Sequence, residues 1–179
     1  MKKKSSPAPL QRKHNKNMDY PKRKLPRLRS YDYSKEGYYF ITICTHEMKR
    51  LFGTTETLNE VGVVAEKELR EISNHFDGVR VDRYVVMPNH IHMVLVLGCD
   101  GVTNREKKLP SVSTILGLYK SGVSRKIRQM YPQMTVWQKS FYDTIIRNKD
   151  MYKEIIKYIY NNPITWNFEK YHLLRKREL

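Results

Sequence analysis

The sequence has little cysteine and no long apolar run. Its two cysteines, Cys44 and Cys99, are too few for a disulfide framework and lack the CxxC spacing of a zinc knuckle. No stretch of about 18 apolar residues occurs, which excludes a transmembrane helix. No apolar segment follows the basic N-terminus, as a secretory signal peptide would require. These absences favour a protein of the reducing cytoplasm.

Acidic residues are also scarce relative to basic ones. The chain has 34 Lys and Arg against 18 Asp and Glu, a net charge of +16, and a pI of about 9.8. Such a surplus indicates a polyanionic partner, and nucleic acid is the first candidate. An anionic membrane surface is less favoured because no long basic amphipathic helix is present. A purely solubilising charge is the remaining alternative. We expect nucleic-acid binding, no membrane partner, and a cytoplasmic, nucleoid-associated location.

The 179 residues fit one domain preceded by a basic arm. Residues 1–29 hold eleven Lys and Arg against one acid, Asp19, and four prolines break any helix there. We interpret this segment as a flexible arm that binds phosphates, although a solubilising tail has the same composition. Residues 30–165 are predicted to form the compact domain, and residues 166–179 a C-terminal tail.

Apolar periodicity predicts a mixed α+β domain. Strands are expected at 38–44, 79–87 and 90–97, with a short one within 136–146, because these runs are rich in β-branched and aromatic residues. Apolar residues at helical spacing predict helices at 59–76, 111–131 and 150–162, the last ended by Pro163. This order favours a ferredoxin-like, mainly antiparallel sheet with helices packed on it.

Two histidines stand in the third predicted strand with one residue between them. Side chains alternate along a strand, so His90 and His92 share a face and Ile91 points away. Two imidazoles at this spacing can bind one divalent cation. The alternative is a histidine pair satisfied by hydrogen bonds or exposed on an edge strand, and the spacing alone does not decide between them.

The last predicted helix ends with a tyrosine and an asparagine at i and i+4. Tyr158 and Asn162 therefore lie on one face, one turn apart. A tyrosine at the core margin and an asparagine that ends a helix before proline would give the same pattern. Tyr160 is a competing phenol, but on a helix it points about 200° away from Tyr158.

Together these residues predict covalent catalysis on a phosphodiester. A phenol with a pKa of about 10 is a poor nucleophile against a charged diester. A cation held by His90 and His92 would polarise the phosphate and favour the ionised form of Tyr158.

The motifs resemble those of the single-tyrosine HUH transposases, and especially the REP-associated tyrosine transposases, over roughly residues 30–165. The resemblance rests on His90-Ile91-His92, on the preceding Val86-Met87-Pro88-Asn89, and on Tyr158-Ile159-x-x-Asn162-Pro163. Supporting stretches are Tyr39-Phe40-Ile41-Thr42, Leu116-Gly117-x-x-Lys120-Ser121, Trp137-Gln138-x-x-Phe141-Tyr142-Asp143 and Ile146-Arg147-Asn148.

The resemblance implies a DNA transposase that cuts and rejoins single-stranded DNA. It implies Mg²⁺ or Mn²⁺ bound by His90 and His92, and Tyr158 as the nucleophile that forms a 5′-phosphotyrosine. Asn162 matches the third ligand of relatives, although Asn161 and Asp143 could also donate an oxygen. Relatives act as monomers or homodimers, and the extra terminal segments favour a monomer.

Contacts with single-stranded or hairpin DNA follow from composition. Candidates for a phosphate track are Lys120, Arg125, Lys126 and Arg128, with Arg27 and Arg29 of the arm. Candidates for base stacking are Trp137, Phe141, Tyr142 and Trp166, for which core packing is the alternative.

Two other functions fit the same residues. One is a catalytically silent module that binds DNA or RNA hairpins; the intact histidines and Tyr158 argue against it. The other is a metal hydrolase in which the histidine pair activates water and no covalent adduct forms. The recognised DNA sequence cannot be read from the chain.

Overall fold

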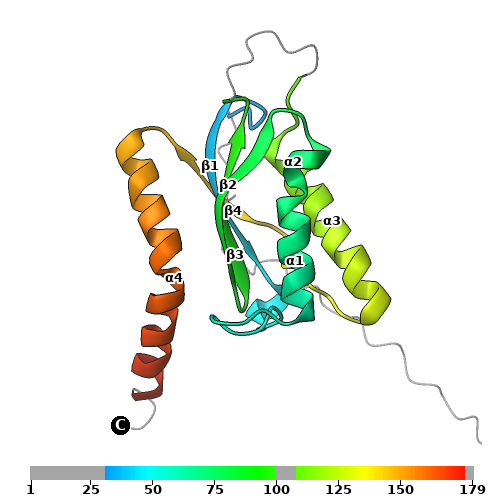
Figure 1. Ribbon diagram of the computed structural model, residues 1–179, viewed down its shortest axis with the longest axis vertical. Coiled ribbons are helices and arrows are strands. Elements are labelled where there is room, and N and C mark those ends of the chain that lie inside the picture. Colours follow the sequence, from blue (N-terminus) through cyan, green and yellow to red (C-terminus); the bar gives the residue numbers. More distant parts are fainter. Residues whose placement is uncertain (1–30, 100–107, 176–179) are drawn as a thin grey trace, which may run out of the picture.

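The computed structural model describes residues 31–99 and 108–175, which form an antiparallel sheet covered by helices on both faces (Figure 1). The strands are β1 (Gly37–Cys44), β2 (Val79–Met87), β3 (His90–Leu97) and β4 (Tyr142–Ile146). The helices are α1 (Glu60–Arg70), α2 (Ile72–His75), α3 (Val112–Met130) and α4 (Lys149–Arg175), with a short 3₁₀ turn at His46–Met48.

The sheet has the order β2-β3-β1-β4, and every neighbouring pair is antiparallel. β2 and β3 form a hairpin closed by Pro88 and Asn89, so Met87 pairs with His90. β1 lies between β3 and β4, and Cys44 pairs with His90. The predicted strands and the α+β class are confirmed.

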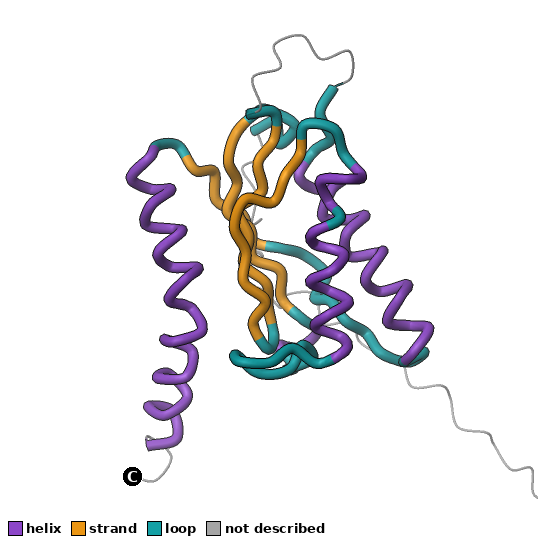
Figure 2. Tube along the Cα trace, in the orientation of Figure 1, coloured by secondary structure: helices purple, strands orange, loops and turns teal. Residues whose placement is uncertain are grey.

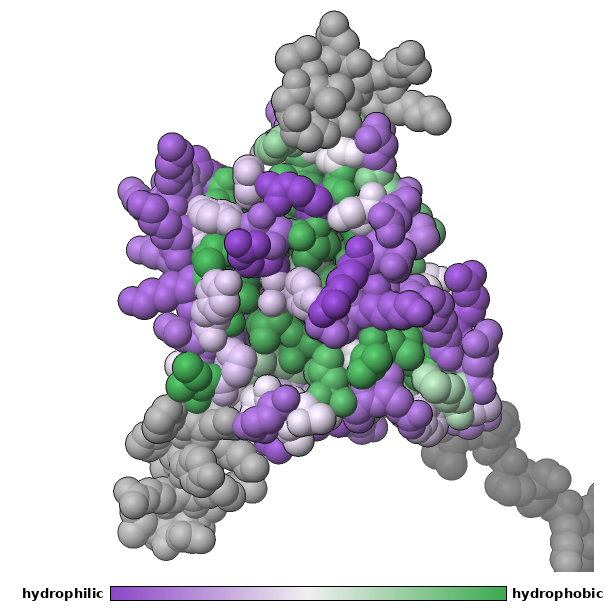
Figure 3. All heavy atoms as spheres, in the orientation of Figure 1, coloured by the Kyte–Doolittle hydropathy of each residue, from purple (hydrophilic) through white to green (hydrophobic). Residues whose placement is uncertain are grey.

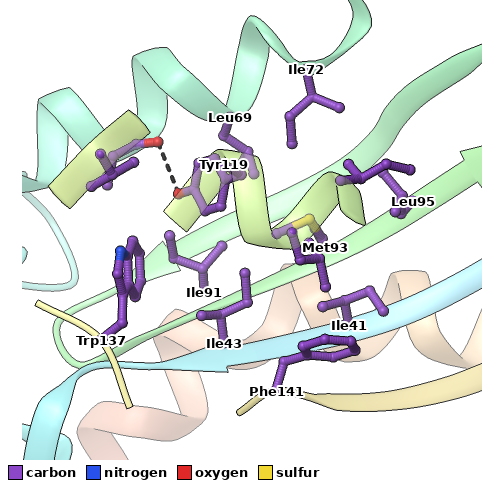
Figure 4. Packing of buried hydrophobic residues seen from close by; sticks show 14 of the residues in the cluster. Ile41, Ile43, Leu69, Ile72, Ile91, Met93, Leu95, Tyr119, Trp137 and Phe141 are labelled. Carbon is purple, nitrogen blue, oxygen red and sulfur yellow. Dashed lines mark hydrogen bonds between the residues drawn. The ribbon is translucent and has the colours of Figure 1, made fainter. Parts of the chain in front are cut away.

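Two layers of helix cover opposite faces of the sheet (Figures 1 and 2): α1, α2 and α3 on one side and α4 on the other. Toward α1 and α3, the strands present fully buried residues such as Ile41, Ile91 and Met93 (Figure 4). In this core the Tyr119 hydroxyl of α3 donates to the Ala65 carbonyl of α1 at 3.0 Å.

The opposite face carries a smaller apolar cluster under α4. Val94, Val96 and Ile146 of the sheet pack against Ile159 and its neighbours on the helix. Because β3 is covered on both faces, its eight residues are all buried. Figure 3 shows hydrophobic residues gathered over the middle of the molecule and hydrophilic ones over its flanks.

Two predicted helix boundaries are wrong. The helix predicted at 59–76 begins as expected, since the Asn59 side chain accepts from the Gly62 N–H at 2.9 Å, but it breaks at Glu71 into α1 and α2. The last helix does not end before Pro163 but continues to Arg175. Proline removes one hydrogen bond and favours a kink. In the turn after this proline, the Thr165 hydroxyl contacts the Asn161 and Asn162 carbonyls at 3.2 Å.

The predicted boundary at residue 165 therefore falls inside a helix, while residues 1–30 lie outside the described ranges. In the part of the chain that the structure covers, no helix is both long and apolar enough to cross a bilayer.

Candidate active site

The two histidines lie side by side at the start of β3, on the face covered by α4. His92 pairs with Thr42 of β1, and His90 pairs with Cys44. The two imidazole centroids are 4.5 Å apart, and the side chains are only 7% and 5% exposed. The alternation along the strand thus gives the common face that the sequence predicts, and the pair is not exposed at a sheet edge.

His90 is held by its sequence neighbour. Asn89 Oδ1 lies 2.7 Å from His90 Nδ1, and Asn89 Nδ2 donates to the Met48 carbonyl at 3.2 Å. Because the Asn89 amide nitrogen is occupied by that carbonyl, its oxygen faces the imidazole and accepts from Nδ1–H. The lone pair of His90 is then on Nε2.

His92 is held from β1. Thr42 Oγ1 lies 2.8 Å from Nδ1, and the Phe40 ring stacks on the imidazole with centroids 5.3 Å apart. If the threonine hydroxyl accepts from Nδ1–H, the lone pair of His92 is on Nε2, the nitrogen that faces α4. The Nδ1 atoms of both histidines are thus engaged by Thr42 and Asn89, which leaves the Nε2 atom of each ring for other partners.

Tyr158 of α4 meets this pair. Its hydroxyl lies 3.3 Å from His92 Nε2, and its ring makes an edge contact with Phe40 at a centroid distance of 6.0 Å. The side chain is still 49% exposed, so a substrate can reach the phenol. Tyr160 is 65% exposed, and none of its contacts in the described residues reaches the histidines.

Asn162 completes the group. It is 6% exposed, and its Oδ1 is fully buried with no hydrogen-bond partner in the described residues. An unpaired buried carbonyl oxygen is costly, which marks it as a candidate ligand atom. Its side chain interacts with His90 and raises the pKa of that imidazole, against the larger effect of burial.

The structure separates the other two oxygen donors from the site. Asp143 pairs with Ile41, so it lies on the sheet face toward α1 and α3, away from the histidines. Asn161 is exposed, whereas Asn162 is buried beside His90. Of the three candidates, only Asn162 is placed to join His90 and His92.

Burial keeps both imidazoles neutral. It lowers the pKa of His90 to about 4, against a smaller opposite effect of Asn162. It lowers the pKa of His92 to about 3, to which the neighbouring His90 adds. At neutral pH both rings therefore carry a free lone pair.

This donor set fits a divalent cation. Two neutral imidazole nitrogens and one unpaired amide oxygen converge beside Tyr158. In the described ranges there is no cluster of three or more His, Cys, Asp or Glu side chains, so the donors would be the two histidines and the amide. Three protein ligands leave coordination positions open for a substrate.

Most of the predicted DNA-contacting residues lie elsewhere. Lys120, Arg125, Lys126 and Arg128 are on α3, the layer opposite the site. The Lys120 amine donates to the Gln138 and Ser140 carbonyls at 2.6 and 3.3 Å, and Lys126 is paired with Glu68. Arg27 and Arg29 lie outside the described residues.

Of the four aromatic residues predicted to stack on bases, two are buried in the main core and two lie outside it. Trp137 is 9% exposed in the main core, where its indole N–H donates to the Lys120 carbonyl at 3.0 Å, so it has no free face for a base. Phe141 is 6% exposed in the same core. Tyr142 is 58% exposed, and Trp166 packs near His90 with centroids 5.4 Å apart.

Thr42, Asn89 and Phe40 contact the imidazoles and orient them. The sequence analysis assigned no role to these three residues. Two signals were available: Asn89 directly precedes His90, and Thr42 and Phe40 alternate with buried residues on β1. Only the strand register shows that Thr42 lies opposite His92.

Comparisons with known proteins identify the family of the chain. Residues 34–162 match the family described as "Transposase IS200 like". An uncharacterized protein of Haemophilus influenzae is 33% identical over 84% of this chain and 93% of its own length. A second protein of that species, provisionally named a REP-associated tyrosine transposase, is 24% identical over 83% of this chain and 87% of its own length.

A solved structure supports the fold. It shows a REP-associated tyrosine transposase bound to a REP hairpin, with a TM-score of 0.54 and 19% identity over 78% of this chain and 73% of that one. The family match covers most of the chain and includes His90, His92, Tyr158 and Asn162. The protein belongs to the IS200-like transposase family and is similar to the REP-associated tyrosine transposases.

Proposed function

We propose that this transposase is a divalent-metal-dependent endonuclease and strand transferase for single-stranded DNA, with Tyr158 as its nucleophile. The observation that carries the proposal is the 3.3 Å contact between the Tyr158 hydroxyl and His92 Nε2, beside His90 and the unpaired Asn162 oxygen. A half-exposed phenol next to a buried set of metal donors is the arrangement that covalent cleavage of a phosphodiester needs.

The reaction conserves the phosphodiester bond. The Tyr158 phenol releases its proton to solvent and its oxygen attacks phosphorus. The bond from phosphorus to the 3′ oxygen breaks, and the leaving oxygen takes up a proton from solvent as a free 3′-hydroxyl. The 5′ end stays esterified to Tyr158. Attack of a 3′-hydroxyl on this phosphotyrosine later rejoins strands, so no ATP is required.

Each residue of the site has a separate part in this reaction. His90, His92 and Asn162 would hold Mg²⁺ or Mn²⁺, which supplies Lewis-acid polarisation of the phosphate when bound. Thr42 and Asn89 fix the orientation of the two imidazoles. Phe40 supports the rings of both His92 and Tyr158, which aligns the nucleophile with the ligands.

A DNA hairpin is the proposed substrate. The net charge of +16 favours a nucleic acid, and a similar solved transposase is bound to a REP hairpin. An unpaired segment beside the hairpin stem would reach Tyr158 without prior melting of a duplex.

Denaturing-gel analysis with end-labelled hairpin DNA from the region flanking the gene tests the proposal. With Mn²⁺, the wild type should give a protein-linked band, and Tyr158→Phe should abolish both the band and cleavage. Tyr160→Phe is the matched control and should retain both, since that phenol lies away from the histidines.

The alternatives give other results. Cleavage by both the wild type and Tyr158→Phe, without an adduct, would show a hydrolase that uses water. Binding without cleavage by either protein would show a hairpin-binding module.

A further inference from the structure

A cavity with charged and aromatic side chains in its lining opens on the α4 side of the sheet, at the far end of the strands from the histidines. Its volume is about 430 Å³, within the range of about 300–1,000 Å³ typical of ligand pockets. Strands β1 and β2, the end of β4 and the first turns of α4 supply its walls. The side chains that carry the argument are Tyr38, Arg80, Asp82, Arg147, Lys149 and Tyr152.

The charge of this cavity favours an anion. The described lining of the cavity holds three cations and one carboxylate, Asp82, which pairs with Arg80 at 2.5 Å. Arg147 and Lys149 are exposed and form no ion pair within the described residues. Their positive charge is therefore available to a phosphate.

The aromatic wall of the cavity favours a ring beside that phosphate. Tyr38 and Tyr152 make an edge contact with centroids 5.7 Å apart. The Tyr152 hydroxyl donates to Asp82 Oδ2 at 2.5 Å, which fixes the ring. Cations that bind phosphates next to aromatic rings that bind bases are the combination used for single-stranded nucleic acid.

An exposed strip joins this cavity to the active site. On the α4 face of β4, Ile146 lies opposite Tyr38, Thr144 opposite Phe40, and Tyr142 opposite Thr42. Thr144 and Tyr142 are exposed, and Tyr142 offers a ring level with Thr42 and His92, at the active-site end of this strip. From Tyr38 to Thr42 the strand advances about 13 Å, roughly four stacked nucleotides and fewer in an extended strand.

We propose that this cavity, called here the nucleotide pocket, binds an unpaired nucleotide of the same DNA strand whose scissile phosphate lies at Tyr158. The inference rests on the proposed function and adds to it a second anchoring point for the substrate. Arg147 and Lys149 contact phosphates, and the wall of Tyr38 and Tyr152 receives the base. A base held in a duplex cannot enter, so the pocket selects single-stranded DNA.

Binding of the full chain to fluorescent DNA, in the Tyr158→Phe background and without metal, tests the pocket independently of cleavage. Arg147→Gln and Lys149→Gln should each weaken binding to a single strand of about 12 nucleotides by about threefold, and together by about tenfold, with a shallower salt dependence. Binding to a blunt duplex should change less than twofold. Lys67→Gln, which removes an exposed charge from α1, is the control and should leave single-strand affinity unchanged.

Asp82→Asn should change the affinity for single-stranded DNA in the opposite direction. Removing the one acid of the pocket should tighten single-strand binding about threefold, an effect that a destabilised fold cannot produce. Photocrosslinking with a strand that contains 5-iododeoxyuridine should label peptides carrying Tyr38 or Tyr152.

The proposed nucleotide pocket would be overturned if the Arg147 and Lys149 variants lost equal affinity for single-stranded and duplex DNA. It would also be overturned if their loss of affinity were no larger than that of Lys67→Gln. Because the binding assay uses the cleavage-deficient background, the absence of a covalent adduct in the wild type would overturn the proposed function but not the pocket.

Discussion

Thr42 and His92 are cross-strand partners, and the threonine hydroxyl lies 2.8 Å from His92 Nδ1 while Tyr158 faces the other ring nitrogen. The sheet therefore orients the imidazole before any substrate arrives. Outer partners of this kind fix the tautomer of a ligating histidine and its ring angle.

Thr42→Val should lower Mn²⁺ affinity and the rate of strand cleavage by about 10- to 100-fold. Valine matches threonine in shape, so the fold is retained while the Nδ1 partner is lost. Calorimetric titration with Mn²⁺ and the gel assay measure the two effects. Thr42→Ser restores the hydroxyl and should recover most of the loss, whereas an unchanged Mn²⁺ affinity for Thr42→Val would show that the hydroxyl does not position the ligand.

The free energy of unfolding of the metal-free protein should depend on pH between the folded-state and unfolded-state pKa values of His90 and His92. Folding lowers the pKa of His90 to about 4 and of His92 to about 3, against about 6.5 in the unfolded chain. Between these values the unfolded state binds more protons, so stability is fully present above about pH 6.5 and falls as pH drops through the window.

Urea denaturation at a series of pH values measures this effect. His92→Gln should reduce the slope of unfolding free energy against pH by about one proton between pH 4 and 6.5. His75→Gln alters an exposed histidine on α2 and serves as the control. An unchanged slope in His92→Gln would show that His92 is not kept neutral by burial.

The sheet and the histidine face were predictable because local pattern decides them. The alternation of side chains predicted around His90 and His92 is found in β3. The turn of the β2–β3 hairpin is formed by Pro88 and Asn89, two residue types that favour turns. The end of α4 was not predictable, since the helix continues past Pro163 to Arg175 and Trp166 packs near His90.

The third ligand and the DNA surface depend on which face of the sheet a residue occupies. The resemblance favours Asn162 as the third ligand and leaves Asp143 as an alternative, but the pairing of Asp143 with Ile41 places it on the opposite face of the sheet. The α3 cations are likewise separated from the site by the sheet, whereas Arg147 and Lys149 lie on the side of Tyr158. Register and layer assignment require long-range contacts that spacing along one chain does not encode.

Asn162→Leu should separate activity from stability. Its Oδ1 is buried without a hydrogen-bond partner among the residues that the structure describes, so an apolar side chain of similar size removes a desolvation cost of about 1–3 kcal/mol. We expect the metal-free variant to be as stable as the wild type or more so, while Mn²⁺ affinity and cleavage fall. Chemical denaturation and calorimetry check the two halves. A variant that loses stability together with activity would show that Asn162 serves packing instead of ligation.

The site should assemble within one chain. Tyr158 of α4 contacts His92 and Phe40 of the same molecule, so neither the nucleophile nor the ligands need a second copy. A mixture of His92→Ala and Tyr158→Phe should therefore remain inactive, because each protein lacks one half of its own site. Gel analysis of the mixture beside the wild type at equal total concentration gives the readout. Cleavage restored by mixing would show that α4 is exchanged between subunits, and the adduct would then form on the Tyr158 of the histidine variant.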